Sequence, residues 1–430
     1  ASSGVIVAGG IFTLPALYIL GLEAQFFQVF MSSLLGGFLG IGLLIPFRKY
    51  FVKDMHGVYP FPEATATTEV LVSGEKKGNQ AKLLAVSGLI GGLYDFIIST
   101  FGWWTEEIST RIAGWGEVLA DKAKLVFKVN TGAAVLGLGY IFGLKYVAII
   151  CAGSFTVWFV LIPFISHFAD GMTLAVGEGV TQLVGQMSPE DTFRHYARNI
   201  GIGGIAMAGI IGIVRSSKII RQALGLAVSE LSGKKGKTKA EAVTPRTQRD
   251  LPMKYILVIL VAVLLTTFIF FQFGLLGNWL HTTIAVLIVF IISFLFTTVA
   301  ANAIAIVGTN PVSGMTLMTL ILTSLVLVSV GLSGTNGMMA GLIIGGVVCT
   351  ALSMAGAFIS DLKIGYWLGS TPAKQEGWKF LGAAVSAATV AGVMIILNKT
   401  YGFVGEGALV APQANAIAAV IKPLMEGGGA

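Results

Sequence analysis

Residues 59–70 read YPFPEATATTEV and lie between two long apolar runs, and this stretch decides how the chain can fold. No helix can run through its two prolines, because proline lacks an N–H and clashes with the preceding turn. Small and hydroxylated residues follow the second proline, which favours a short, tightly packed helix ending near Gly74. The carboxylates Glu63 and Glu69 stand six residues apart in it. In a membrane protein this pattern predicts a broken segment that lines a cavity.

The composition indicates that the chain is an integral membrane protein. Of its 430 residues, 55% are hydrophobic and 11% charged, and the mean hydropathy is +0.84. A soluble protein carries about 25% charged residues. Apolar runs of membrane-spanning length recur without the alternation of a β-barrel, and 56 glycines allow close helix packing. We therefore predict an all-α polytopic transmembrane helical bundle with broken or re-entrant segments, and two pseudo-symmetric halves remain an open alternative.

The charges agree with this class. The net charge is +7, and the basic residues stand in short connections, as the positive-inside rule requires. The lipid bilayer, and not a nucleic acid, is therefore the expected partner. The organisation predicted is a first group of membrane segments over 1–228, a basic cytoplasmic loop over 229–252 and a second group over 253–430. Because the chain starts at once in an apolar segment, we expect it to be a fragment truncated at both ends.

Local patterns predict individual elements. A glycine-rich span over 25–46 should end at Pro46, and a second span should cover 83–102. Aromatic and charged residues mix over 103–128, which is typical of a helix at the membrane interface or at a cavity mouth. The apolar run 130–165 is too long for one span of ~20 residues, so a hairpin broken near Gly143 is favoured. Further spans are predicted over 255–276, 279–306, 336–358 and 378–397.

Acidic side chains inside apolar regions are the first functional candidates. A carboxylate in the membrane costs at least ~2.5–3.5 kcal/mol, so it persists only when paired, protonated or facing water. Burial raises the pKa of such a group and can make it a proton carrier. Glu63, Asp95 and Glu178 fit this description. For Glu63 and Glu69 the alternative is a place at the cytoplasmic rim, where they would balance the basic residues after Pro46.

Hydroxyl and amide groups form a second set. Thr65 and Thr67 would bind substrate polar groups or, equally well, carbonyls of their own helix. Residues 310–316, NPVSGMT, interrupt a later apolar run and carry the candidates Asn310, Ser313 and Thr316. A broken backbone must be satisfied by protein, water or substrate, although a plain turn between helices is the alternative. Interrupted segments in both halves indicate a transporter binding site, and we expect 59–69 and 310–316 to face one cavity.

Asp361 and Lys363 stand at the end of a span, where they would form a salt bridge or contact a charged substrate. Exposed pairs of this kind are common and contribute little. The four histidines form no metal-ligand spacing, and there is no phosphate-binding loop and no nucleophile elbow. The sequence therefore predicts no catalytic residue, metal or cofactor, and a protein that is not an enzyme.

Several stretches resemble one family. Residues 59–68 resemble the "YPSGTATA"-type motif of the oligopeptide transporter (OPT) family, in particular its yellow stripe-like branch and bacterial relatives. IFTLPA at 11–16 and PFR at 46–48 are similar to neighbouring family segments. DLKIGY at 361–366, followed by STP at 370–372, is similar to the family's "DFKTGY…SP" stretch. Tyr59 and Tyr366 thereby join the candidate residues.

The resemblance implies a secondary active transporter, driven by protons, that moves oligopeptides or metal-chelate, siderophore-like molecules into the cytoplasm across a bacterial inner membrane. The chain departs from the motif at Phe61-Pro62-Glu63, where the family has Ser-Gly, and this adds a charge. A passive channel or permease for ions or small solutes is the alternative function. The sequence does not indicate an oligomeric state.

Overall fold

The structure is a computed structural model that describes residues 10–426, except for 76–78, 171–182, 309–311, 406–407, 410 and most of 199–244. The regular secondary structure of the described chain is helical apart from one two-stranded sheet. The predicted all-α class is therefore confirmed. Seven described helices are long and apolar enough to cross a membrane: Phe26–Asp54, Ala81–Phe101, Leu144–Phe168, Arg246–Leu276, Trp279–Val307, Gly334–Trp367 and Pro372–Thr400. Shorter apolar helices cover Gly10–Ile19, Ala133–Phe142 and Gly314–Ser329.

The chain divides into two compact units, residues 1–64 with 205–430 and residues 65–204. The division falls within α4 (Pro62–Glu75), the helix that the sequence predicts after the second proline and that the structure confirms. The first unit contains α2 (Pro15–Ile19), α3 (Phe26–Arg48), η1 (Lys49–Asp54), η6 (Arg246–Gln248), α12 (Met253–Phe271), η7 (Gln272–Leu276), α13 (Trp279–Val307), α14 (Val312–Ser329), α15 (Gly334–Trp367), α16 (Pro372–Thr400) and α17 (Pro412–Met425).

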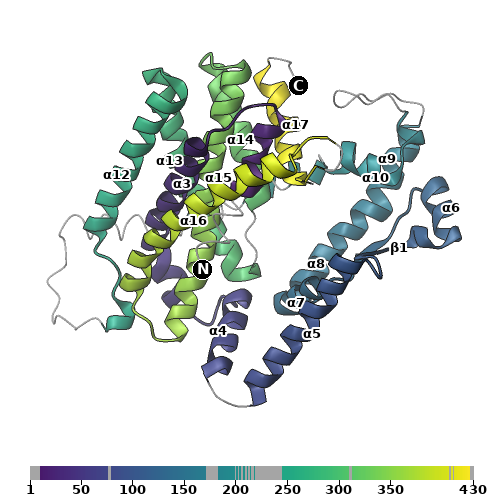
Figure 1. Ribbon diagram of the computed structural model, residues 1–430, viewed down its shortest axis with the longest axis horizontal. Helices are drawn as coiled ribbons and strands as arrows, with labels where there is room; N and C mark the ends of the chain where they lie inside the picture. The colour runs from purple at the N-terminus through teal and green to yellow at the C-terminus, as the bar shows by residue number, and fades with distance from the viewer. Residues whose placement is uncertain are drawn as a thin grey trace. The chain divides into compact units, whose positions relative to one another are not determined.

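The core of the first unit is α15, which packs against α3, α13 and α14 (Figure 1). In its most apolar window, 94% of the residues of α15 are buried. Two glycines of α3 make the closest approach. A Cβ on Gly36 or Gly40 would lie 2.3 Å from the carbonyl oxygen of Val347 or Ala351 on α15. The two helices therefore touch backbone to backbone, as small residues four positions apart permit in membranes.

The end of α3 differs from the prediction. The helix does not stop at Pro46 but includes it, runs to Arg48 and continues as the π-helical η1 to Asp54. Proline removes one backbone donor, and the wider turns of a π-helix allow the chain to continue without the regular bonding pattern. This extension carries Val52 and its carbonyl into the site described below.

The second unit holds α5 (Asn79–Phe101), α7 (Ala133–Phe142), α8 (Leu144–Phe155), η3 (Thr156–Leu161), α9 (Ile162–Phe168), η4 (Val184–Gln186), α10 (Pro189–Thr192) and η5 (Phe193–Ala197). The break predicted near Gly143 is confirmed. Gly143 separates α7 from α8 with φ 78°, a backbone conformation that glycine adopts without steric cost.

The helix predicted over 103–128 is wrong for most of its length. Only α6 (Gly114–Lys122) is an α-helix, preceded by the short turn η2 (Thr110–Ile112). On either side, β1 (Glu107–Ser109) pairs antiparallel with β2 (Lys128–Asn130). Ile108 lies opposite Val129 in this pair, and β-branched residues favour strands.

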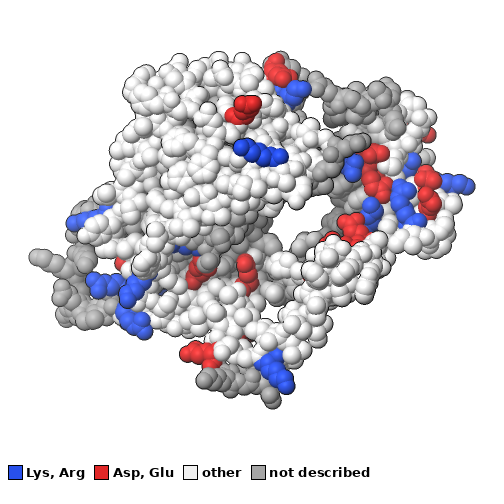
Figure 2. Space-filling model, viewed as in Figure 1, with Lys and Arg blue, Asp and Glu red and all other residues white. Residues whose placement is uncertain are grey.

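Apolar side chains cover the long helices of the second unit on the outside. In the most apolar windows of Ala81–Phe101 and Leu144–Phe168, only 6% of the residues are buried within the protein. Leu89 and Leu144 are 64% and 86% exposed. On the face shown in Figure 2, charged residues occupy only scattered patches, and most of the described surface consists of uncharged residues. These surfaces suit contact with lipid and not with water.

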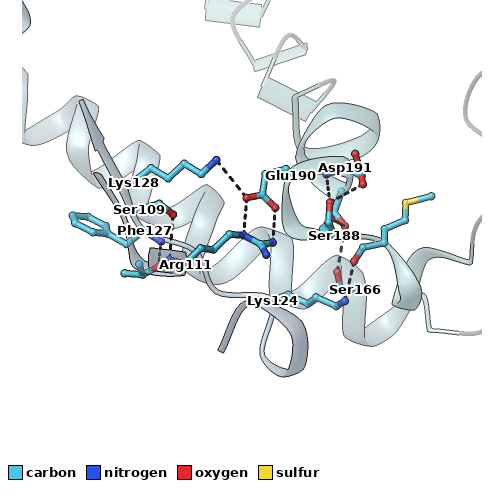
Figure 3. A network of polar contacts seen from close by, with 12 residues as sticks. Ser109, Arg111, Lys124, Phe127, Lys128, Ser166, Ser188, Glu190 and Asp191 are labelled. Carbon is cyan, nitrogen blue, oxygen red and sulfur yellow. Dashed lines mark hydrogen bonds and ion pairs between the residues drawn. The ribbon is translucent and has the colours of Figure 1, made fainter. Parts of the chain in front are cut away.

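An ion-pair network fastens the strand-bearing connection to α10 (Figure 3). Arg111 Nε and Nη2 donate to the two carboxylate oxygens of Glu190 at 3.1 and 2.8 Å, and Lys128 Nζ lies 3.4 Å from Oε1. Lys124 Nζ donates to the Met187 carbonyl at 2.8 Å. Ser188 caps α10 by accepting the Asp191 N–H. The paired geometry of Arg111 on a carboxylate is the strong form of such a contact.

The network makes the stability of the second unit pH-dependent. Burial alone would raise the pKa of Glu190, but the hydrogen bonds and charges of Arg111 and the charge of Lys128 outweigh it and lower the pKa. A carboxyl with a lowered folded pKa stabilises the fold above its unfolded pKa of about 4.3, and this contribution disappears as the pH falls through the folded pKa. We expect Glu190→Gln to lower the thermal midpoint at neutral pH and to reduce its dependence on acid pH.

The measurement is thermal unfolding in detergent between neutral and acid pH. Glu107→Gln, an exposed acid of β1, is the matched control and should behave as the wild type. Equal acid sensitivity of Glu190→Gln and the wild type would show that the pair contributes nothing.

Candidate functional site

The candidate site surrounds the ammonium group of Lys363, near the C-terminal end of α15. Lys363 is fully buried. Its Nζ donates to the Val52 carbonyl of η1 at 2.8 Å and lies 3.1 Å from His56 Nδ1. Among the described residues it makes no ion pair. A buried cation of this kind must be stabilised by other groups.

Aromatic rings supply that stabilisation. Lys363 Nζ lies 5.1 Å from the ring centre of Phe61, 5.3 Å from that of Tyr366 and 5.2 Å from that of Trp367. A cation within about 6 Å of a ring face is attracted by its quadrupole, and the attraction increases when water is excluded. The site thus joins the stretch before α4 to the end of α15.

The backbone at Phe61 is held in an unusual conformation. Its φ is 44°, in the left-handed region that favours glycine. The Phe61 N–H donates to the Ala305 carbonyl in the last turn of α13 at 3.0 Å, and its side chain is 1% exposed. Strained conformations of this kind persist where the surroundings fix them, and they occur often at functional sites.

Tyr59 packs against η1, the element that also supplies the Val52 carbonyl. Its ring lies 6.0 Å from that of Phe51. Burial, together with a hydrogen bond to Tyr50, raises the pKa of Tyr59 to about 12. The hydroxyl therefore stays protonated at physiological pH and serves as a hydrogen-bonding group.

The two charges predicted at the end of a span have different partners. Asp361 pairs with Lys379 of α16 at 2.5 Å, whereas Lys363 points to the Val52 carbonyl and the aromatic rings. Glu63 follows in the first turn of α4. Although its side chain keeps contact with solvent, partial burial raises its pKa, and the charge of Asp361 raises it further.

The remaining candidates are distributed more widely. Thr65, Thr67 and Glu69 lie along α4. Asp95 accepts the N–H of Ala133 at 2.9 Å at the start of α7. Asn310 and Glu178 fall outside the described residues. For Ser313 only the backbone is described, and it lies in α14. Thr316 is buried and donates to Cys349 Sγ at 2.8 Å.

A charged cluster that the sequence did not reveal lies near the same end of α3. Arg48, 2% exposed, pairs with the two carboxylate oxygens of Asp250 through Nε and Nη2 of its guanidinium group. Glu376 of α16 is fully buried and accepts the Leu251 N–H at 2.7 Å. The only sequence signal is a basic residue two positions after Pro46.

A pocket of about 470 Å³ lies elsewhere in the first unit. Its lining includes Glu23, before α3, and Lys399, in the last turn of α16. Lys363 and Asp361 contact the opposite ends of these elements, η1 and the first turns of α16. The pocket is therefore not part of the Lys363 cluster.

The fold and the site define a polytopic helical membrane protein with an interrupted segment held at a buried cation. A family model described as OPT oligopeptide transporter protein matches residues 1–430, and the chain belongs to this family. A Haemophilus influenzae protein whose name proposes an oligopeptide transporter is 26% identical over 451 residues, covering 98% of this chain and 68% of the relative. The chain is thus a membrane transporter, and the prediction that it is not an enzyme is confirmed.

Proposed function

We propose that the protein is a secondary active transporter that carries oligopeptides, or metal chelates of similar size, together with protons into the cytoplasm. The membership of the family supports transport, and the name of the Haemophilus influenzae relative supports a peptide substrate. The bacterial source of that relative supports a place in a bacterial inner membrane.

One observation carries the proposal. The stretch that leads into α4 and the end of α15 meet where Lys363 Nζ lies 5.1 Å from the ring centre of Phe61. These are the same two stretches that resemble motifs of the family. A strained, interrupted segment is suited to change conformation, because relief of the backbone strain offsets part of the cost of leaving the present state.

Glu63 is the proposed proton carrier of this segment. Burial and the nearby Asp361 carboxylate both raise its pKa, so it binds a proton at higher pH than an isolated glutamate does. Protonation would also remove the repulsion between the two acids. Glu63 is separated from the strained Phe61 by one residue, so its charge state acts directly beside the interrupted backbone.

The shared cavity remains part of the proposal. The Phe61 N–H bonds to Ala305, five residues before Asn310, which brings the first interrupted segment to the chain that precedes the second. From residue type alone, we further propose that the hydroxyls of Thr65 and Thr67 and the amide of Asn310 bind polar groups of the substrate.

The test is uptake by the whole transporter in proteoliposomes, with a panel of labelled short peptides and iron chelates. We expect the wild type to accumulate at least one of these when an inward proton gradient is imposed. Glu63→Gln should lose most of this accumulation and its pH dependence, because glutamine has the shape of glutamate but cannot titrate.

Glu107→Gln, outside the proposed site, should retain normal uptake. Unchanged pH-dependent uptake by Glu63→Gln would refute the titration of Glu63. Flux that never exceeds equilibration, with or without the gradient, would instead identify a passive channel or permease.

A further inference from the structure

Glu376 is a buried acid with an unfilled hydrogen-bonding capacity. It lies in the second turn of α16 and is fully buried. Its Oε2 accepts the Leu251 N–H at 2.7 Å, while Oε1 has no hydrogen-bond partner among the described residues. An ionised carboxylate removed from water is strongly disfavoured unless it is paired, and a neutral carboxyl is not.

The nearest cation is already engaged. Arg48 Nη2 donates to Asp250 Oδ2 at 2.9 Å, and Arg48 Nε pairs with Asp250 Oδ1. Lys379, one turn beyond Glu376 on α16, pairs with Asp361 of α15. Arg48 thus makes its ion pair with Asp250. When Glu376 is ionised, the cluster of Arg48, Asp250 and Glu376 carries one negative charge more than positive charge.

The other charged groups around the cluster are also engaged or lie on its outer side. Lys53 of η1 donates to Gln248 Oε1 at 2.6 Å. Arg246 donates to Thr371 Oγ1 at 3.4 Å. Arg249 contributes its carbonyl oxygen to the Ala373 N–H at the start of α16. Among the described residues, none of these supplies an ion pair to Glu376.

Asp250 is the partly exposed acid of this cluster. The Asp250 side chain is 30% exposed, whereas Glu376 is fully buried, and Asp250 directly precedes the residue whose N–H binds Glu376. A proton can therefore reach the buried acid by way of a partly exposed one.

We propose that Glu376 is a second proton-binding group of this transporter, protonated at Oε1 from water through Asp250. The proposal rests on the proposed function. The Asp250 carboxylate first accepts a proton from solvent and then passes it to Oε1, where an O–H bond forms. Asp250 returns to its ionised form, and Oε2 keeps the Leu251 N–H. When the proton leaves, the charged Glu376 competes with Asp250 for Arg48. The charge state of Glu376 thereby controls the contacts that join α3, α16 and the chain before α12.

The first test compares Glu376→Gln with the wild type in the whole transporter. We expect Glu376→Gln to lose gradient-driven accumulation of the peptide or chelate that the wild type accumulates. Exchange of the same probe without a gradient should continue, because glutamine preserves the shape and the bond to Leu251. Glu107→Gln should retain both activities. Gradient-driven accumulation by Glu376→Gln at the wild-type level would overturn the proposal.

The second test does not depend on transport. Infrared difference spectra between acid and neutral pH contain a C=O band from every acid that takes up a proton in this range, Glu63 included, and one of these bands in the wild type and in Glu107→Gln should belong to Glu376. Glu376→Gln should lack this band, and Glu376→Asp, which keeps a carboxyl, should shift it. A band unchanged in both Glu376 variants would overturn the proposal, and the Asp variant provides the answer if the Gln variant does not fold. A wild type without proton-driven uptake would refute the proposed function, while the spectra would still decide whether Glu376 binds a proton.

Discussion

Replacement of Gly40 by valine is expected to prevent the stable folding of the first unit. Even the Cβ of the new side chain would lie 2.3 Å from the Ala351 carbonyl oxygen and 3.0 Å from the Ala351 carbonyl carbon. Because these are backbone atoms of the central helix, no side-chain rotation relieves the clash. Overpacking of a core costs typically ~1–3 kcal/mol, and more where the backbone cannot move. Since α3 and α15 form the main contact of the unit, we expect the upper end of this range or beyond.

The measurement is the yield of monodisperse protein in detergent and its thermal midpoint. Gly88→Val is the matched control, because a Cβ on Gly88 of α5 meets no atom within 4 Å. The control should express as the wild type does. Equal stability of the two variants would show that α3 and α15 are farther apart than described.

Replacement of Lys363 by methionine is expected to abolish most transport while leaving the bundle folded. Methionine fills the volume but leaves the Val52 carbonyl without its donor, which costs ~1–3 kcal/mol. It also removes the cation that Phe61, Tyr366 and Trp367 surround, a contact of about 2 kcal/mol when desolvated. Loss of the buried charge offsets part of this cost. The net loss of stabilising free energy falls on the strained stretch before α4. Each ~1.4 kcal/mol of it changes tenfold the population of the conformation in which this stretch is held at Lys363.

Uptake into proteoliposomes and thermal stability should be measured on the same preparation. Lys374→Met is the control. It removes a lysine in the first turn of α16 that lies outside the Lys363 cluster. We expect a severe loss of uptake for Lys363→Met and none for Lys374→Met. Normal uptake by Lys363→Met would show that the convergence at Lys363 is structural and not part of transport.

The parts of the fold that depend on local chemistry could be predicted. Proline fixes where a helix cannot continue, so residues 59–62 were expected to interrupt the chain and α4 was expected to follow. A glycine in a long apolar run indicated the break at Gly143. The length of an apolar run predicted the spans because the thickness of a bilayer sets that length.

The parts that depend on distant contacts could not. The strands β1 and β2 each have three residues, and the local sequence of neither one indicates its partner, 19 to 23 positions away. Pro46 shows the opposite error, since a local rule predicted a helix end that the tertiary contacts of α3 and η1 override.

The site shows the same limit. Asp361, Lys363 and Tyr366 were identified as candidates from type and resemblance, but spacing could not assign their partners. Arg48 and Asp250 pair across 202 positions, and Glu376 binds a backbone N–H 125 positions away. In a single sequence such residues are indistinguishable from ordinary charges at the ends of helices.

The positions of the two cysteines of this chain have a practical consequence for labelling with thiol reagents. Cys349 is fully buried in α15, and Cys151 is exposed on the apolar surface of α8. Where a bilayer covers that surface, a water-soluble maleimide has no accessible native target in this chain. Single cysteines introduced along α4 would be the sole reactive thiols, and their labelling rates with and without substrate would record directly when this helix becomes accessible from each side of the membrane.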